Sequence, residues 1–288
     1  MTAAHRAAEP HTDDEHPTLP DAPVAAGPRE SSVAAWLAHT VILAGRQLSV
    51  WVRDYTTLAQ SLLFPALTMI MFTVVLGDVV SETTGQDSAF GTVPLVILVG
   101  AMFGSMAAAV RLNRERGTGL LARLYVLPIH RAADLSARII AELVRILVAT
   151  IVLLIAGLAI GFRFTQGVGA AIGIVGVALL YGMSFSMAVL ALAVNARPGG
   201  PIVPMISLLA SVMMFFNSGF SPIEAYPQWL QPIVTNQPMT PAIEVMRSLA
   251  TGGPITENLV KVVIWAVALL VVFTWPALRG YRRAATNR

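Results

Sequence analysis

The sequence contains no cysteine and one lysine, Lys261. Without cysteine, the chain has no disulfide, no thiolate chemistry and no cysteine-ligated metal site. A Walker A loop needs glycines followed by Lys-Ser or Lys-Thr, because its lysine must reach the terminal phosphates of ATP. Lys261 is followed by Val262 and preceded by no glycine loop, and the metalloprotease motif H-E-x-x-H is also missing. We therefore expect no catalytic residues, no metal site and no directly bound cofactor in this chain.

Charged residues are scarce as well, at 12%, whereas 56% of the residues are hydrophobic. A bilayer core about 30 Å thick needs roughly 20 apolar residues for each helical span. Six continuously apolar segments meet this length, and their lack of alternation favours helices over barrel strands. They cover residues 57–80, 91–110, 139–161, 168–194, 201–220 and 259–278. The sequence predicts an all-α polytopic membrane protein with six transmembrane helices, and counts of five or seven are the alternatives.

The segments around these spans differ from them in composition. Residues 1–32 are polar and rich in proline and acids, which predicts a disordered cytoplasmic tail. Residues 33–56 mix tryptophan and leucine with arginine, as in an amphipathic helix lying along the inner leaflet. An additional span is the alternative there, but Arg46 near its centre would make that span costly. Residues 284–288 are expected to form a short cytoplasmic tail.

The segment before the last span, 221–256, is rich in proline and aromatic residues, which favour the membrane–water interface. Within it, Pro241 and Gly252 are typical of the start and stop of a short amphipathic helix. The apolar face of that helix would carry Ile243, Met246 and Leu249. We expect a partly re-entrant outer segment.

Arginines are concentrated between the second and third spans and near both ends of the chain. The opposite loops have few cations, namely Arg163, Arg247 and Lys261. Because arginine and lysine mark the cytoplasmic side of short loops, the N- and C-termini are both predicted to be cytoplasmic. The predicted location is the plasma (inner) membrane.

Polar groups inside the spans are few. Asp78, Glu142, Arg145 and Lys261 are expected near span ends, where long side chains reach water. Glu142 and Arg145, three residues apart, are predicted to pair. Gln60 and Asn217 are candidates for a substrate path or for helix–helix contacts. Glycines four residues apart, as in 100–104, allow close helix packing.

The stretch "RERGTGLLARLYVLP" begins at Arg114 in the basic loop. Its leucines recur at helical spacing, Gly117 and Gly119 permit a sharp change of direction, and Pro128 ends the helix. The pattern predicts a short amphipathic helix on the cytoplasmic side that carries several arginines.

Two stretches carry a resemblance to a known family. "RERGTGLLARLYVLPIHRAADLSARII" resembles the loop of ABC-2 type transporter permeases, in which E-x-G-T leads into a coupling helix. "SGFSPIEAYPQWLQPIVTNQPMTPAIEVMRSLATGG" is similar to the family's outer segment before the last helix. The resemblance covers roughly residues 33–283, and within the family it points to the actinobacterial daunorubicin-resistance (DrrB/DrrC) group, closest to the DrrC type. One departure is Gly119-Leu120, where many relatives have an acidic residue directly after Gly-Thr.

The resemblance implies the permease subunit of an ATP-driven exporter, with ATP and Mg²⁺ bound by a separate cytoplasmic ATPase. A second permease chain, identical or DrrB-like, and membrane lipids are the other implied partners; no nucleic acid is expected. The implied substrate is hydrophobic or amphiphilic, either a drug such as an anthracycline or a cell-envelope lipid. The alternatives are a membrane-embedded lipid-modifying enzyme and a passive scaffold. The residues implied in coupling to the ATPase are Arg114, Glu115, Arg116, Gly117, Thr118, Leu120, Leu121, Arg123 and Leu124.

Overall fold

The computed structural model describes residues 32–84, 88–120, 123, 128–130, 132–197 and 200–286. All regular elements within these ranges are helices, which confirms the predicted all-α class. The long helices are α1 (Val33–Arg53), α3 (Phe64–Thr84), α4 (Ala89–Gly117), α6 (Ala133–Ala159), α7 (Gly167–Asn195), α8 (Ile202–Phe215), α10 (Met239–Thr251) and α11 (Thr256–Thr286). The short elements are α2 (Tyr55–Leu58), the π-helix η1 (Ala59–Leu63), the 3₁₀ turn η2 (Ile223–Ala225) and α9 (Gln231–Asn236). Residues 1–31 of the predicted tail at 1–32 lie outside the described residues.

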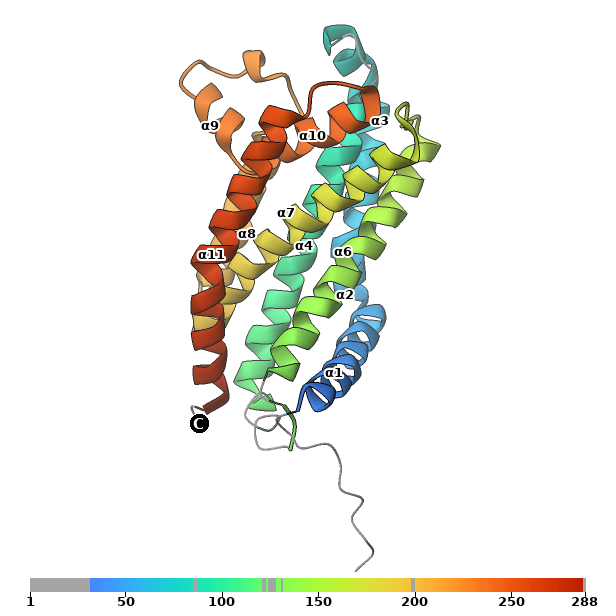
Figure 1. Cartoon of the computed structure of the whole chain (residues 1–288). Helices are drawn as coiled ribbons and strands as arrows, with labels where there is room; N and C mark the ends of the chain where they lie inside the picture. The colour runs from blue at the N-terminus through green and yellow to red at the C-terminus, as the bar shows by residue number, and fades with distance from the viewer. Residues whose placement is uncertain are drawn as a thin grey trace, which may run out of the picture.

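The helices form an elongated bundle whose two ends we call lower and upper, as drawn in Figure 1. From α1 at the lower end, the chain runs through α2, η1 and α3 to the upper end, and α4 returns. Helix α6 ascends, α7 descends obliquely across the bundle and α8 turns back upward. After η2, α9 and α10 at the upper end, α11 descends. The beginning of α1 and the end of α11 therefore lie at the same end of the molecule.

Among the described residues, six helices are long and apolar enough to cross a membrane. They are Val33–Arg53, Tyr55–Val75, Ala89–Gly117, Ala133–Ala159, Gly167–Asn195 and Thr256–Arg283. Five of them overlap predicted spans, and the sixth is α1. The predicted span at 201–220 is shorter than expected: α8 has 14 residues, or about 21 Å at 1.5 Å per residue. Its helix ends at Phe215, before the turn that contains Asn217.

Helix α1 lies beside the lower part of α6, and the chain continues in the same general direction beyond it (Figure 1). Its buried face includes Thr40, Gln47 and Trp51, whereas Leu37 and Val41 are exposed. Asp54 separates it from α2, and its carboxylate accepts hydrogen bonds from the backbone N–H groups of the next helix. Because the chain does not reverse there, α1 and α3 belong to a single passage along the bundle.

The π-helix η1 occurs just before Pro65. Proline lacks a backbone N–H and its ring crowds the preceding turn, so the helix must adjust locally. The hydroxyl of Ser61 donates to the carbonyl of Thr57 at 2.7 Å. A Cβ atom at Gly100 would lie 3.1 Å from the Ser61 carbonyl oxygen, so the glycine lets α4 approach this segment closely.

Helix α4 is the centre of the bundle, with contacts to α3, α6, α7 and α10. Its residues from Thr92 to Met102 are all buried. The outer helices instead expose large apolar side chains, among them Val74, Ile155, Leu208 and Val271. An apolar exterior of this extent is typical of a surface that contacts lipid.

At the upper end, α10 packs against α4, α7 and α11. Ile243 and Met246 are fully buried and Leu249 packs against the same core, so the predicted apolar face is confirmed. The helix ends at Gly252, whose φ of 90° lies in the left-handed region that glycine adopts readily. This segment closes the upper end of the bundle.

Candidate functional site

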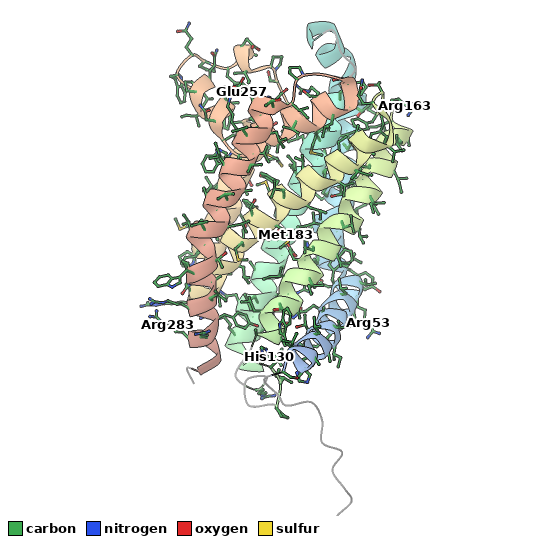
Figure 2. The ribbon with its side chains drawn as sticks, viewed as in Figure 1. Arg53, His130, Arg163, Met183, Glu257 and Arg283 are labelled. Atoms are coloured by element: carbon green, nitrogen blue, oxygen red, sulfur yellow. The ribbon has the colours of Figure 1, made fainter. Side chains whose placement is uncertain are left out.

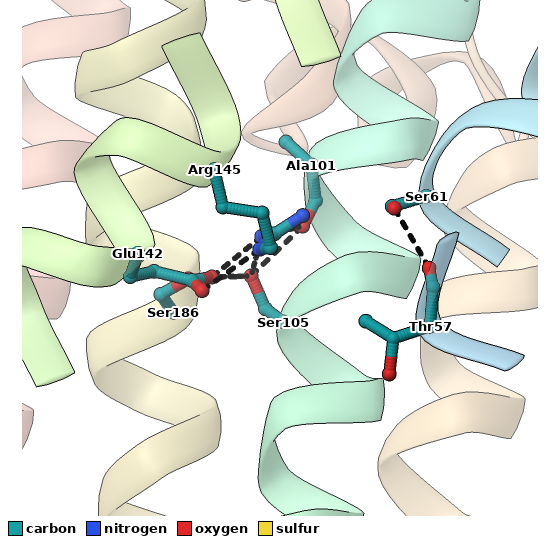
Figure 3. A network of polar contacts seen from close by, with 7 residues as sticks. All are labelled: Thr57, Ser61, Ala101, Ser105, Glu142, Arg145 and Ser186. Atoms are coloured by element: carbon teal, nitrogen blue, oxygen red, sulfur yellow. Dashed lines mark hydrogen bonds and ion pairs between the residues drawn. The ribbon is translucent and has the colours of Figure 1, made fainter. Parts of the chain in front are cut away.

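The bundle interior contains a buried ion pair within a polar network, here called the central network: Ser105 of α4, Glu142 and Arg145 of α6, and Ser186 of α7 (Figure 3). Arg145 donates to both carboxylate oxygens of Glu142, from Nη2 at 2.6 Å and from Nε at 2.9 Å. Such a bidentate pair fixes geometry more firmly than a single contact does. The predicted pairing of Glu142 with Arg145 is confirmed.

The serines complete this network. The Ser105 hydroxyl lies 2.7 Å from Glu142 Oε1, and the Ser186 hydroxyl also donates to that carboxylate. Arg145 Nη2 reaches the backbone carbonyl of Ala101 at 3.2 Å (Figure 3). The network therefore joins the middle of α4, α6 and α7, about one turn below Met183, which Figure 2 labels.

The expectation that Glu142 and Arg145 lie near a span end and reach water is wrong. Arg145 lies in the middle of α6 and is 2% exposed. The helix begins at Ala133, six residues before the predicted span, because the polar residues Asp134, Ser136 and Arg138 face partners at the lower end instead of ending the helix. Two charges can be buried here because each satisfies the other and the serines supply further hydrogen bonds.

A second group of ionic contacts, here called the lower cluster, lies where α4 ends and α6 begins. Glu115 forms an ion pair with Arg138 at 2.6 Å, and Arg46 of α1 lies 3.8 Å from its other oxygen. Arg138 also contacts Asp134 at 3.3 Å and the hydroxyl of Tyr281 at 3.0 Å. These contacts connect α4 with α1, α6 and α11.

Arg116 makes the corresponding connection to α7. Its Nη1 donates to the carbonyl oxygens of Ala193 at 3.0 Å and Ala196 at 2.7 Å. The last carbonyls of a helix have no partner within the helix and carry the negative end of its dipole, so a guanidinium group stabilises them. The end of α4 is therefore held to the end of α7.

The predicted coupling residues divide into two groups. Glu115 and Arg116 have partners within the chain, whereas the side chains of Arg114 and Arg123 are exposed. Gly117 is the last residue of α4, and the Thr118 hydroxyl caps the helix by donating to the Glu115 carbonyl at 3.0 Å.

The chain turns immediately after this cap. Gly119 has a φ of 72°, as expected for a sharp change of direction. The backbone N–H of Arg123 donates to the Gly119 carbonyl at 3.1 Å, and Leu120 is half-buried in the turn between them. The predicted Leu121 and Leu124 lie outside the described residues, so the full coupling helix stays a prediction.

Helix α1 is tied to the same end of the molecule by two further contacts. The indole N–H of Trp36 donates to the Ser136 hydroxyl at 3.1 Å. His39 Nδ1 accepts a hydrogen bond from the backbone N–H of His130 at 3.1 Å, and Figure 2 shows His130 at the lower end. The two histidines, isolated in the sequence, thus meet in the structure. No group of three or more potential metal ligands occurs within the described part of the chain.

Asn217 and Gln60 differ in environment. Asn217 is fully buried, but its amide donates to the carbonyls of Met213 and Met214 and accepts from the N–H of Gly219. Among the described residues, the side-chain hydrogen bonds of Asn217 stay within its own segment, where they close the end of α8, and none of them reaches a neighbouring helix. Gln60 is exposed and lines a hollow beside Phe64 and Phe103. A role for either residue in a substrate path stays a prediction.

Sequence reasoning missed the partners of Glu115 and the two serines of the central network. Arg138 lies 23 residues from Glu115, and Ser186 lies 44 residues from Glu142. The sequence signal for the contact between Arg46 and Glu115 was the position of Arg46 within a largely apolar helix, because a charged residue there requires a partner. Serine in a membrane helix is too common to indicate a particular contact.

A bundle of membrane-length helices with an internal ion pair and a basic end is the architecture of a polytopic membrane protein. The model of the ABC-2 type transporter family matches residues 38–250. The chain belongs to the ABC-2 type transporter family.

Named relatives agree with this assignment. The chain is 36% identical over 258 residues to the probable doxorubicin resistance ABC transporter permease protein DrrC of Mycobacterium tuberculosis, covering 90% of this chain and 93% of that one. It is 25% identical over 254 residues to the daunorubicin resistance ABC transporter permease protein DrrB1 of Streptomyces coeruleorubidus, covering 88% of each. The doxorubicin resistance permease protein DrrB of M. tuberculosis is 25% identical over 182 residues, or 63% of each chain.

Proposed function

We propose that this chain is the membrane subunit of an ATP-driven exporter and that a separate ABC ATPase docks at its lower end. The sequence has no Walker A loop, so ATP must be hydrolysed elsewhere. The names of the relatives as ABC transporter permeases support this division of labour.

The observation that supports the proposal is the set of contacts between the end of α4 and the neighbouring helices. Glu115 and Arg116 link this end to α1, α6 and α7, and Arg138 extends the link to α11. The exposed Arg114 and Arg123 border the adjoining turn and are free to contact a docked ATPase. A push on this turn would reach four other helices, which is how a local event becomes a change of the whole bundle.

The distribution of cations supports a cytoplasmic lower end, and hence cytoplasmic termini. Arginines at the lower ends of α4, α6 and α11 are Arg111, Arg114, Arg116, Arg138, Arg279, Arg282 and Arg283. The upper end holds Arg163, Arg247 and Lys261, and Figure 2 shows Arg163 and Arg283 at opposite ends. The positive-inside rule then assigns the lower end to the cytoplasm of a plasma-membrane protein.

The substrate is a hydrophobic or amphiphilic molecule, either a drug of the doxorubicin and daunorubicin class or a lipid of the cell envelope. The drug assignment is supported by the names of the relatives. A second permease chain, identical or related, completes the transport path. A second, related permease chain is supported by M. tuberculosis, which has both a DrrC and a DrrB relative of this chain.

The experiment is reconstitution of the chain with its cognate ATPase in vesicles, with ATP-dependent movement of doxorubicin followed by fluorescence. Arg123→Glu should weaken co-purification of the ATPase and reduce transport, because it reverses the charge of an exposed residue beside the turn. Arg163→Glu, an equal change at the upper end, is the control and should leave both unchanged. Transport that proceeds without the ATPase would contradict the proposal, and so would equal effects of the two variants. A lipid substrate would appear as ATP-dependent movement of labelled lipid in the same vesicles.

A further inference from the structure

The exposed face of α11 changes from apolar to cationic near its lower end. Between Lys261 and Arg279 the helix has 17 uncharged residues, which span about 26 Å at 1.5 Å per residue. This length is close to the thickness of a bilayer core, about 30 Å. Val271 and Trp275, one turn apart on this stretch, are 71% and 57% exposed. The exposed arginines that follow below them are Arg279, Arg282 and Arg283. An apolar surface suited to lipid therefore ends in a group of positive charges.

The side chain of Arg279 is directed upward along the helix. Its guanidinium carbon lies 3.5 Å from the centre of the Trp275 ring, one turn above. Helical side chains lean toward the N-terminus of their helix, which in the descending α11 is the direction of the apolar stretch (Figure 1). The contact with the indole face stabilises this position, and tryptophan favours the membrane–water interface. The guanidinium is therefore held at the level where hydrocarbon meets the lipid head groups.

Acidic side chains at this end of the molecule lie on the other side of α11. Neither α7, which packs along α11, nor the lower half of α11 contains aspartate or glutamate. Glu115 and Asp134 form their ion pairs with Arg138. The Arg138 guanidinium also contacts the hydroxyl of the buried Tyr281, which is two residues from Arg279 and so about 200° around the helix. Among the described residues, Arg279 forms no ion pair.

We propose that this face of α11 binds the head group of an anionic phospholipid, with Arg279 and Trp275 as the contacts nearest the hydrocarbon. A guanidinium group presents N–H donors in a planar fork that suits phosphate oxygens. Arg282 and Arg283 follow within about one turn and add positive charge on the same side of the helix. Figure 2 shows Arg283 at the lower end of α11.

A lipid fits this face better than a docked protein does, because the apolar stretch and the arginines form one continuous surface. The exposed side chains of Val271 and Val272 can contact acyl chains directly above the arginines. Basic segments next to a membrane span attract anionic lipids. The site stands on these contacts and does not depend on the transport proposal.

The test uses the purified full-length chain in a neutral detergent, without ATPase, and native mass spectrometry of bound lipid. Phosphatidylglycerol and phosphatidylcholine with identical chains are the probes, because both contain a phosphodiester and only the first has a net negative charge. We expect stronger retention of phosphatidylglycerol. Arg279→Gln should weaken that retention about five-fold, as expected for the loss of one arginine next to an anionic lipid. Arg163→Gln is the matched control and should bind as the parent does, since this exposed arginine lies at the upper end and its Nη1 donates to the carbonyls of Leu158 and Phe162.

Two substitutions of Trp275 test its contact with Arg279. Trp275→Phe keeps an aromatic face and should retain most of the binding. Trp275→Leu keeps an apolar surface without the ring and should weaken retention about two- to five-fold. Equal retention of the two lipids, equal effects of Arg279→Gln and Arg163→Gln, or equal effects of the two Trp275 variants would overturn the proposal. So would an Arg279→Gln variant that loses co-purification of the ATPase with unchanged lipid retention, because a protein would then cover this face.

Discussion

Gly104 of α4 provides the space that the guanidinium group of Arg145 occupies. A Cβ atom at Gly104 would lie 1.7 Å from Arg145 Nη1 and 2.5 Å from its Cζ. Both distances are far below contact distance, so any other residue at this position must displace the arginine. The glycine spacing at 100–104 therefore serves two contacts, one with the backbone of η1 and one with a buried charge.

Gly104→Ala is expected to destabilise the protein by about 2 kcal/mol or more, because the methyl group overpacks the site and disturbs the ion pair. The measurement is the thermal unfolding of the purified protein in detergent. Gly176→Ala in α7 is the control, since a Cβ there meets nothing within 4 Å. Alanine favours a helix over glycine, so the control should be neutral or slightly stabilising. Similar losses in both variants would show that Gly104 has no special relation to Arg145.

Glu142→Leu should cost about 3–5 kcal/mol, because it leaves the buried Arg145 without its counter-charge. The double variant Glu142→Leu/Arg145→Met should recover much of that loss, since no uncompensated charge remains. Unfolding temperatures of the two single variants and the double variant form the cycle that measures this coupling. The Glu244–Arg247 pair, with side chains 24% and 25% exposed, is the comparison, and Glu244→Gln should cost about 1 kcal/mol or less. Additive losses in the Glu142 and Arg145 variants would rule out a coupled pair.

Asp54 caps α2, and the hydrogen bond from the Thr57 hydroxyl holds the pKa of its carboxyl below the usual range, against a smaller opposing effect of burial. The folded pKa is lower than the unfolded one, so the stabilisation is complete above about pH 4 and is lost as the pH falls through the folded value. Asp54→Ala should cost about 0.5–2 kcal/mol at pH 7 through loss of the cap. The difference from the parent protein should shrink below pH 4, as measured by unfolding at several pH values. Asp54→Asn keeps an acceptor that does not titrate, so its stability should lack this pH dependence.

The helical class and most spans could be predicted from the sequence, because runs of about 20 apolar residues have few other stable arrangements in a membrane. The pairing of Glu142 with Arg145 followed from local helical spacing. The end of α10 at Gly252 could also be predicted from nearby residues, because glycine commonly ends a helix. Each of these depends on residues close together in the chain.

Among the features that sequence reasoning missed, the depth of Arg145 and the partners of Glu115 depend on residues distant in the chain, whereas the end of α8 depends on local hydrogen bonds. The depth of Arg145 is set by Gly104 and by serines on two other helices, and no local pattern reports such a combination. The prediction for α8 failed because apolar composition continues past Phe215, while the side chain of Asn217 closes the helix through local carbonyls. The partners of Glu115 come from α1 and α6, so its internal role was hidden in a stretch that suggested contact with another protein.

Glu115→Gln should uncouple ATP hydrolysis from transport while leaving the fold intact. Its carboxylate holds Arg138 at 2.6 Å and lies near Arg46, so the neutral amide loosens the end of α4 from α6 and α1. We expect a tenfold or greater fall in ATP-dependent transport per ATP hydrolysed, with ATPase co-purification preserved. The check is a parallel measurement of hydrolysis and transport in vesicles. Glu257→Gln removes an ion pair with Lys261 at the opposite end, where the glutamate side chain is 82% exposed, and should change neither quantity. If Glu115→Gln reduced hydrolysis and transport by the same factor, the ion pair would serve docking or stability and not the transmission of movement.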